Sequence, residues 1–417
     1  MTTNTHRNLP PGWRWVKLSE ILFSLETGSR PKGGARGITT GVPSLSAEHM
    51  TRFGTFDFSD LRYVPLEYYK QMSKGHVKLD DILIVKDGAT TGKVAIVTKA
   101  FPYKEAVINE HVFLCRLDKS VIEPSFVFYF LWSATGQTQI RESFQGAAIG
   151  GINQSFTERV IIPLPPLAEQ QRIAARLNEE MAAVAQARQA AEEQLRAARE
   201  LPAVYLRKVF ENFDVKDIPK RYLGDFVISY RNGFGRRPKD SEENGVIVLR
   251  LADVTGGVIN LDNPRRVSMT HDEIKMYCVE DGDLLFVRVN GSKDLVGRVA
   301  VVKDLPTIVA YNDHLIRVKI TKAILPEYVK LVSETKSARN FIVEKASTSA
   351  GQLTINQEMI RSLEIPYLTL NKQKELVEKY RKMICDICQM VFDIESQLAE
   401  INQLPAALLR EAFMGNL

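Results

Sequence analysis

The sequence has few of the features that mark secreted or membrane proteins. It contains only four cysteines in 417 residues, which suits a reducing compartment better than a disulfide framework. No apolar run approaches the roughly 18 residues that a membrane-spanning helix needs, and the first 15 residues contain no apolar stretch of the signal-peptide type. We therefore expect a soluble, cytoplasmic protein that has no membrane partner.

Signatures of nucleotide, zinc and redox chemistry are also missing. Residues 88–93 resemble a phosphate loop, but there is one residue too few between the glycines, and Val94 stands where Ser or Thr should hold magnesium. Cys385 and Cys388 have no second Cys or His pair near them in sequence. The chain also lacks a dinucleotide fingerprint, a nucleophile elbow and a methyltransferase signature. We expect no bound cofactor, no metal and no catalytic residue.

One group of charged residues needs a separate explanation. Asp262, Glu273 and Lys275 faintly resemble the carboxylate and lysine core of a nuclease. However, Thr270 followed by Glu273 fits a capping box, which predicts the start of a helix. A helix at this point would deny the nuclease core its strand geometry, so we predict that the chain is not an enzyme by itself.

The composition is that of a globular protein with more than one domain. The chain has a mass of 47.0 kDa, and 45% of its residues are hydrophobic and 25% charged. Its net charge of +5 permits a polyanionic partner without requiring one. The placement of the charges must therefore decide whether nucleic acid is a partner.

The chain repeats itself at a nearly constant interval. The triplet Ile-Asn-Gln occurs twice, and its asparagines, Asn153 and Asn356, are 203 residues apart. The other paired segments keep nearly the same interval: 81–83 with 283–285, 92–95 with 297–300, 109–111 with 312–314, 162–164 with 365–367, and 201–203 with 404–406. A fixed interval of this size indicates a tandem duplication of a unit slightly over 200 residues long.

The first three-quarters of each unit predicts a mixed α/β globule. Short apolar runs bounded by Gly, Pro and Asp predict buried strands at 82–85, 94–97, 112–117, 284–289, 299–302 and 315–320. Segments 126–132 and 328–332 each follow a proline, Pro124 or Pro326, and are helix candidates because Pro is favoured near a helix start.

The last quarter of each unit predicts a long helix. Residues 167–200 and 370–403 contain no Gly or Pro. Apolar residues at a 3–4 spacing define a coiled-coil seam in the second copy: Val377, Tyr380, Ile384, Ile387, Val391, Ile394, Leu398 and Ile401. The repeat interval carries this seam onto a slimmer stripe in the first copy: Ala174, Leu177, Met181, Val184, Arg188, Ala191, Leu195 and Ala198.

A bulky stripe facing a slim one favours packing of the two helices on each other, and we expect an antiparallel coiled coil; the alternative is that each stripe packs on its own globule. About 33 residues of helix span about 50 Å, which makes a spacer. Pro202 and Pro405 are predicted to end the two helices. Short apolar tails, 204–210 and 408–414, follow and should fold against a globule or a partner.

These boundaries give a duplicated architecture with pseudo-twofold symmetry. Residues 1–165 and 213–367 are the two expected globules, and residues 166–212 and 368–417 are the two expected spacer helices.

Each globule carries a flexible basic loop. The first loop, 27–36, has three cations and no acid, and the second, 231–239, has four cations and no acid; the cations are Arg30, Lys32, Arg36, Arg231, Arg236, Arg237 and Lys239. Glycines let backbone N–H groups approach phosphates, and Arg and Lys recognise phosphates and guanine edges. Each loop alone could be an ordinary solvated loop, but their recurrence favours contact with DNA.

A second candidate surface follows the strand at 82–85 and its counterpart. It contains donors and acceptors that suit base edges: Lys86, Asp87, Gly88, Thr90, Thr91 and Lys93 in the first copy, and Arg288, Asn290, Gly291, Ser292, Lys293 and Arg298 in the second. The two copies differ here, as two readers of different sequences would, although loop drift explains the same difference. The paired Asn109/His111 and Asn312/His314 are interpreted as structural.

At this point the residues resemble a known family. Residues 163–173, Pro-Leu-Pro-Pro-Leu-Ala-Glu-Gln-Gln-Arg-Ile, resemble the junction typical of specificity (S) subunits of type I restriction–modification enzymes. The plan of globule, long helix, globule and long helix is similar too. The second junction, 365–373, departs from the motif because it lacks Pro-Pro and Ala-Glu-Gln.

The resemblance implies a non-catalytic subunit that recognises DNA sequence. Each globule would be a target-recognition domain that reads half of a bipartite site in double-stranded DNA, and the antiparallel helices would hold the two at a set distance. Methyl transfer and cleavage would belong to two modification (M) subunits, which bind S-adenosylmethionine, and to restriction (R) subunits. The S chain would be their scaffold.

Two alternatives from other classes stay open. A coiled-coil adaptor would bind proteins through both globules and show no salt-sensitive affinity for DNA. A fused methyltransferase would need a cofactor loop and would bind S-adenosylmethionine alone.

Overall fold

The structure is a computed structural model, and it describes residues 9–35, 37–144, 150–211, 218–235, 244–255, 257–349 and 351–415. The chain forms two compact units. Unit 1 comprises residues 1–192 and 396–417, and unit 2 comprises residues 193–395. Each unit therefore contains a globule together with parts of the long helices, whereas the sequence predicted the helices as separate segments.

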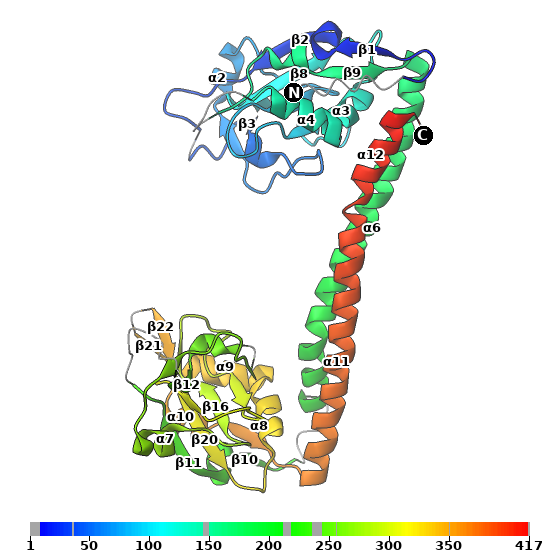
Figure 1. Ribbon diagram of the computed structural model, residues 1–417. Coiled ribbons are helices and arrows are strands. Elements are labelled where there is room, and N and C mark those ends of the chain that lie inside the picture. The colour runs from blue at the N-terminus through cyan, green and yellow to red at the C-terminus, as the bar shows by residue number, and fades with distance from the viewer. Residues whose placement is uncertain are drawn as a thin grey trace. The chain divides into compact units, whose positions relative to one another are not determined.

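Unit 1 begins with a globule of short strands and helices (Figure 1). Its strands are β1 (Arg14–Lys17), β2 (Leu22–Thr27), β3 (Val42–Leu45), β4 (Arg62–Val64), β5 (Ile82–Val85), β6 (Val94–Ile96), β7 (Val107–Ile108), β8 (Val112–Leu117) and β9 (Ile161–Leu164). Its helices are α1 (Leu18–Ile21), α2 (Leu66–Gln71), α3 (Pro124–Trp132), α4 (Ala134–Glu142) and α5 (Phe156–Arg159).

Strand β5 shows how this globule is layered. It lies inside a four-stranded sheet in the order β2-β8-β5-β6, and a three-stranded sheet, β4-β3-β7, forms a separate layer. Ile82 and Ile84 point to the core shared with α3 and α4, whereas Leu83 and Val85 point to the core shared with β3 and β7. Because successive side chains alternate between faces, one strand supplies both cores.

Unit 2 contains a second globule. Its strands are β10 (Lys220–Tyr222), β11 (Val227–Asn232), β12 (Val246–Leu249), β13 (Val254–Thr255), β14 (Val258–Ile259), β15 (Arg266–Val267), β16 (Leu284–Val287), β17 (Val289–Asn290), β18 (Val299–Val301), β19 (Val309–Tyr311), β20 (Leu315–Ile320), β21 (Ser347–Ser349), β22 (Gln352–Thr354) and β23 (Glu364–Pro366). Its helices are α7 (His271–Tyr277), α8 (Pro326–Ser333), α9 (Lys336–Lys345) and α10 (Gln357–Arg361).

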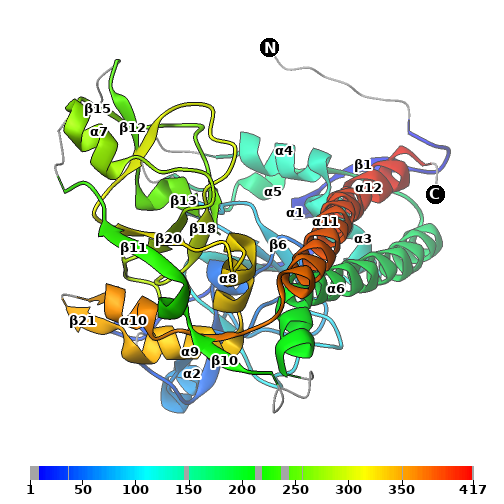
Figure 2. The same ribbon diagram turned by 90° about the horizontal axis from the view of Figure 1, so that it is seen from below.

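The strand pairings of unit 1 recur in unit 2. The sheet β11-β20-β16-β18 corresponds to β2-β8-β5-β6, the sheet β15-β12-β19 to β4-β3-β7, and the pair β10-β23 to β1-β9. Figure 2 shows α7, β12 and β15 on one side of β11 and β20, and α9 and α10 on the other. Strand β16 again serves both sides, with Leu284 and Phe286 facing one core and Leu285 and Val287 the other.

The expected strands and helices are largely confirmed. Strands β5, β8 and β20 have the predicted bounds, and α3 and α8 begin at Pro124 and Pro326. The predicted strand at 284–289 is divided into β16 and β17. Thr270 caps α7 by accepting a hydrogen bond from the Glu273 N–H, and the Glu273 carboxylate accepts one from the Thr270 N–H, so the capping box is confirmed.

The first long helix corrects one prediction. Helix α6 runs from Leu167 to Glu211 and contains Pro202 in its interior, so Pro202 does not end it. An interior proline costs about 3 kcal/mol. The apolar residues after it offset this cost, because Leu206, Val209 and Phe210 pack into the core of unit 2.

The second long segment is two helices instead of one. Helix α11 spans Leu370–Ile401, and α12 spans Leu404–Met414 with Pro405 in its first turn. Pro405 therefore marks a break, as predicted. The apolar side of α12 packs on unit 1, where the Phe413 ring lies 5.3 Å from the rings of both Phe126 and Phe130 in α3.

The predicted seam positions of both long helices are buried or half-buried. Ile387, Ile394 and Ile401 are each at most 8% exposed, whereas Cys385 and Cys388 are exposed. Within unit 2 the end of α6 packs on the start of α11, because Leu206 shares a core with Leu376, Val377 and Tyr380. Arg199, earlier in α6, pairs with Glu395, later in α11, at 2.7 Å. The two helices therefore run antiparallel in unit 2.

Candidate nucleic-acid interface

In both globules the basic loop leaves its strand at a glycine that nothing larger could replace. A Cβ atom on Gly28 would lie 1.8 Å from the Ile108 carbonyl oxygen, and one on Gly233 would lie 2.0 Å from the Asn312 carbonyl oxygen. At this point the backbone of the loop touches the backbone of the turn that precedes β8 or β20, which leaves no room for a side chain. We call this place in each globule the corner. The loop start is pinned beside the turn before β8 in unit 1 and before β20 in unit 2.

The second candidate surface meets the first at the same corner. The Lys86 N–H donates to the His111 carbonyl oxygen at 2.8 Å, and the Lys86 carbonyl accepts from the Ile152 N–H at 2.8 Å. In unit 2 Arg288 makes the same two bonds, with His314 at 2.7 Å and Ile355 at 2.9 Å. The Ile of each Ile-Asn-Gln triplet, Ile152 or Ile355, is therefore hydrogen-bonded to the turn after β5 or β16. That turn is itself bonded to the one before β8 or β20.

The Asn of each Asn-x-His landmark is structural, as predicted. The Asn109 side-chain oxygen accepts a hydrogen bond from the His111 N–H at 3.0 Å, and the Asn312 side-chain oxygen accepts one from the His314 N–H at 3.2 Å. Each asparagine thereby closes the turn that carries the neighbouring acid, Glu110 or Asp313.

Acids balance the cations at this corner of unit 1. Arg30 lies 2.7 Å from a carboxylate oxygen of Glu110, and the Lys86 ammonium lies 3.7 Å from the Asp87 carboxylate. Nδ1 of His111 lies 2.5 Å from Asp87, and its Nε2 lies 3.4 Å from Glu110. Arg30 keeps 62% of its side chain exposed. Cations and carboxylates therefore lie side by side at this corner, and the Glu110 oxygens are buried there.

Arginine occupies the equivalent place in unit 2. The Arg288 guanidinium donates to the Asp313 carbonyl oxygen at 3.0 Å, just as the Lys86 ammonium donates to the Glu110 carbonyl oxygen at 3.2 Å. Arg231 is exposed at the end of β11. Next to it the Asn232 side-chain oxygen accepts from the Gln357 amide at 3.3 Å. Gln357 is the first residue of α10, so this bond holds the start of α10 beside β11.

Several predicted residues have local structural contacts. The Lys93 ammonium donates to the Met50 carbonyl oxygen at 2.9 Å, and the Arg298 guanidinium donates to the Asp294 carbonyl oxygen at 2.8 Å. Thr91 donates to the Gly88 carbonyl oxygen at 2.7 Å. These bonds fix the positions of the three side chains.

The remaining predicted residues are exposed, hold a turn or lie outside the description. Lys32, Thr90 and Lys293 are exposed. The Asn290 side-chain oxygen accepts from the Ser292 N–H at 2.8 Å, which shapes the turn after β17. The residues outside the described part of the chain are Arg36, Arg236, Arg237 and Lys239.

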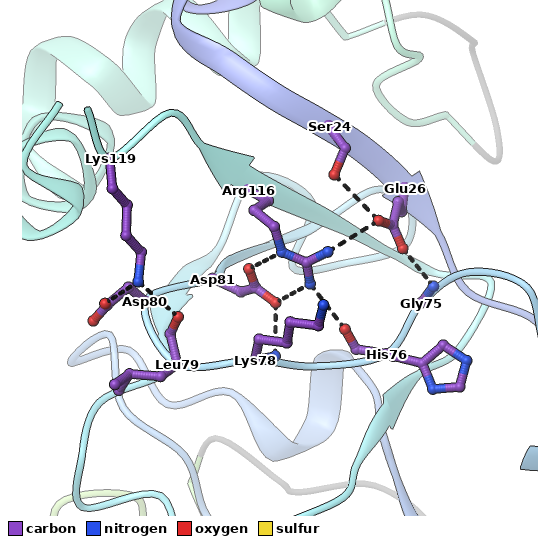
Figure 3. A network of polar contacts seen from close by, with 10 residues as sticks. All are labelled: Ser24, Glu26, Gly75, His76, Lys78, Leu79, Asp80, Asp81, Arg116 and Lys119. Carbon is purple, nitrogen blue, oxygen red and sulfur yellow. Dashed lines mark hydrogen bonds and ion pairs between the residues drawn. The ribbon is translucent and has the colours of Figure 1, made fainter. Parts of the chain in front are cut away.

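A polar network joins β2, β8 and the turn before β5 (Figure 3). Arg116 in β8 donates to both carboxylate oxygens of Asp81, at 2.9 and 2.7 Å, and lies 3.3 Å from Glu26. Glu26 in turn accepts from the Gly75 N–H at 2.6 Å. A Cβ atom on Gly75 would lie 3.2 Å from the Gly28 Cα. The network therefore supports the backbone against which the basic loop begins.

Burial dominates the electrostatics of Asp81. Its side chain is 1% exposed, and burial raises the pKa of its carboxyl, while hydrogen bonds from Arg116 and the Lys78 N–H act in the opposite direction. In unit 2 burial likewise raises the pKa of Asp283, which accepts from the Glu280 N–H at 2.9 Å. Each buried acid closes the turn before β5 or β16.

The sequence did not reveal that each junction contains a buried glutamine in the same position, Gln170 in the first and Gln373 in the second. Gln170 accepts from the Glu123 N–H at 2.9 Å and donates to the Pro165 carbonyl oxygen at 2.9 Å. Gln373 accepts from the Leu325 N–H at 2.9 Å and donates to the Leu368 carbonyl oxygen at 2.8 Å. Although the junction motifs differ, each long helix is joined to its globule through the same bonds. The repeat interval of 203 could have identified this pair.

The sequence placed Asp87 on the second candidate surface but did not reveal which charges the acids at this corner meet. Only the fold shows that Asp87 and Glu110 face Lys86, Arg30 and His111. Within the described ranges no three His, Cys, Asp or Glu side chains come together as a metal ion would need. Among those same residues no helix combines the length and the apolar character required to cross a membrane.

Comparisons with known proteins agree with this geometry. Residues 10–190 match the family described as Type I restriction modification DNA specificity domain. The chain is 28% identical to the EcoKI specificity subunit of Escherichia coli (strain K12), and 26% identical to the StySPI specificity subunit of Salmonella potsdam. Each alignment covers 98% of this chain and 90% of the relative.

Solved structures show the same fold. The HsdS subunit from Thermoanaerobacter tengcongensis aligns over the full length of both chains with a TM-score of 0.59 and 20% identity. A chain from work on complex assembly and conformational transition of the type I R-M system aligns with a TM-score of 0.73 and 20% identity, over 98% of this chain and 99% of that chain. Residues 10–190 thus match a DNA specificity domain, and nearly the whole chain is similar to the specificity subunits of type I restriction–modification systems.

Proposed function

We propose that the chain recognises a bipartite sequence in double-stranded DNA, with one half-site read by each globule. It is the non-catalytic specificity subunit of a type I restriction–modification complex. The globules are two copies of one target-recognition domain, and α6 and α11 hold them apart as an antiparallel coiled coil. Two M subunits bring S-adenosylmethionine and methyl transfer, and R subunits bring cleavage.

One observation carries this proposal above all. Both globules place a cation, Lys86 or Arg288, at the same corner and tether it to the carbonyl oxygen of the equivalent residue, Glu110 or Asp313. A basic loop starts beside each cation. A solvated loop needs no such repeated support, whereas a reader of base edges does, because direct readout requires donors in fixed positions.

The differences between the two corners support separate half-sites. Unit 1 has Asp87 next to its cation, and the local interval of 202, which relates 81–83 to 283–285, places Val289 there in unit 2. A carboxylate can accept a hydrogen bond from the cytosine amino group, which a valine cannot do. One scaffold therefore presents two recognition surfaces.

Exchange of one globule tests modular reading. Residues 213–366 are replaced by the corresponding segment of a relative with a different target, and the methylated sites are mapped in a host that supplies the M subunits. We expect one half-site to change and the other to persist. The reciprocal exchange of residues 10–165 should change the opposite half. Modular reading is refuted if either exchange alters both halves or neither.

Salt dependence tests the two tethered cations. Lys86→Ala and Arg288→Ala in the assembled methyltransferase should each weaken binding and reduce the slope of log affinity against log salt by about one. Lys119→Ala is the matched control, because Lys119 follows the opposite end of β8 and pairs with Asp80. Slopes that equal the control would remove these cations from the phosphate contacts.

The adaptor alternative makes the opposite prediction for the same measurement. A coiled-coil adaptor would show no sequence-dependent DNA affinity with or without M subunits, and its partners would be proteins. A fused methyltransferase would bind S-adenosylmethionine without any partner. Calorimetric titration of the purified chain with S-adenosylmethionine therefore tests this alternative directly.

A further inference from the structure

A charged side chain interrupts the slim seam of α6. The repeat interval aligns Arg188 with Val391, so a guanidinium stands where the second copy has an apolar residue. Arginine in a coiled-coil seam costs stability unless its charge has a partner. The Arg188 side chain is nevertheless only 19% exposed, so its surroundings must accommodate the charge.

Arg188 has two partners. Its guanidinium lies 3.9 Å from the Glu192 carboxylate one turn later on α6, and its second partner belongs to the globule of unit 1. The guanidinium carbon lies 3.5 Å from the centre of the Phe53 ring, and the Arg52 guanidinium lies 4.7 Å from the same ring. A cation at this distance from an aromatic face is attracted by the ring quadrupole. Phe53 therefore connects the globule to the helix at a point far along α6.

The turn that carries Phe53 is rigidly attached to the globule. The Thr51 N–H donates to the Thr55 carbonyl oxygen at 2.8 Å, and the indole N–H of Trp132 donates to the Arg52 carbonyl oxygen at 3.2 Å. Gly54 has φ +75°, and a Cβ atom on it would lie 2.4 Å from the Phe128 ring. Movement of Phe53 thus requires movement of the globule.

A cleft separates this contact from the place where the start of α6 joins the core of the globule, which we call the root. The cleft has a volume of about 440 Å³ and is lined by Phe56, Ile96, Phe128, Trp132, Met181 and Val184. At the root, Ile173, Ala174 and Leu177 of α6 are part of the main core of unit 1. Arg188 lies 11 residues beyond Leu177, or about 16 Å along the helix at 1.5 Å per residue.

This geometry makes the contact an angular restraint. A pivot at the root would let the globule tilt into or away from the cleft, and a contact about 16 Å from the pivot opposes tilting far more effectively than a contact at the root. On DNA, a spacer longer by one base pair moves a half-site by about 3.4 Å and rotates it by about 35°. A globule must tilt to follow such a change.

We propose that Arg188 is a positioning residue that latches the first globule to α6 through Phe53, and so helps to restrict the complex to one spacer length between the half-sites. The inference rests on the proposed function for its effect on DNA, while the latch itself can be tested without DNA. Because Val391 has no guanidinium, the corresponding position of unit 2 does not have this latch.

The test without DNA measures the globule against its helix in the full chain. Spin labels are attached at two exposed positions: Lys99, between the cleft-lining residues Thr98 and Ala100, and Ala190, two residues beyond Arg188 on α6. Cys278, Cys385 and Cys388 are replaced by serine. Pulsed electron resonance should give a narrow distance distribution, which broadens in Arg188→Ala and in Phe53→Leu. Arg176→Ala is the control, because Arg176 pairs with Glu180 on α6 itself. Unchanged distributions in both variants would overturn the latch.

The test with DNA uses the complex with M subunits and duplexes whose half-sites are separated by the native spacer or by one base pair more or less. We expect Arg188→Ala to lower the preference for the native spacer by roughly threefold to thirtyfold, Arg188→Lys to have a smaller effect, and Arg176→Ala to have none. Broadened distances with an unchanged spacer profile would overturn the role in specificity. A wild-type complex without any bipartite target would refute the proposed function, while the distances would still decide the latch.

Discussion

Removal of Arg116 should destabilise unit 1 through the acid that it leaves behind. In Arg116→Met the Asp81 carboxylate, which is 1% exposed, loses two hydrogen bonds of 2.9 and 2.7 Å and keeps the one from the Lys78 N–H at 2.7 Å. Breaking a buried ion pair from one side costs 3–5 kcal/mol. We expect about 3 kcal/mol, near the lower end of this range, because Arg116 is 19% exposed and the Lys78 bond persists.

Hydrogen exchange of the full chain measures this effect locally. Amides of β5 and β8 should exchange roughly a hundredfold faster in the variant, while peptides of unit 2 act as an internal reference. Arg62→Met is the matched control, because Arg62 pairs with Glu48 at 2.9 Å where both side chains are 48% exposed, and such surface pairs contribute less than about 1 kcal/mol. Equal effects of the two substitutions would refute the reasoning.

The pH dependence of the same variant has a definite sign. Without Arg116 the pKa of Asp81 should rise further, so the folded state takes up a proton more readily than the unfolded state. The destabilisation is then greatest above the folded-state pKa and declines as the pH falls towards the unfolded value. Unfolding should show a larger difference from wild type at pH 8 than at pH 5. A difference that grows on acidification would contradict a buried charge as the cause.

Three other predictions concern the junctions, the corner and the thiols. Gln170→Ala and Gln373→Ala should each destabilise the start of a long helix by about 2 kcal/mol, because buried backbone groups lose their partners, and local hydrogen exchange would detect it. Gly28→Ala should lower the melting temperature more than a typical surface substitution, because its Cβ would overlap the backbone. Iodoacetamide should label exposed Cys385 and spare Cys115, which is buried and whose pKa is raised by burial. Mass spectrometry after brief labelling measures both sites, and labelling of Cys115 before Cys385 would contradict this burial.

Local patterns in the sequence determined the elements and their repetition. Apolar runs bounded by Gly, Pro and Asp located β5, β8 and β20, because a buried strand needs little more than such a run. The Thr270 capping box located α7 for the same reason, since its hydrogen bonds join residues three apart. Pro202 misled the prediction, because the local cost of an interior proline is outweighed by packing of Leu206 and Phe210 at a distance in sequence.

Only the tertiary structure decided which charges meet. Arg30 and Glu110 are 80 residues apart in the chain, and Arg188 and Phe53 are 135 apart, yet each pair is in contact. No local propensity encodes such contacts, because they arise from how sheets and helices pack. The sequence alone therefore established two similar globules with long helices and a basic loop in each, while folding determined that carboxylates balance the cations of the first corner and that an arginine of the helix holds the first globule.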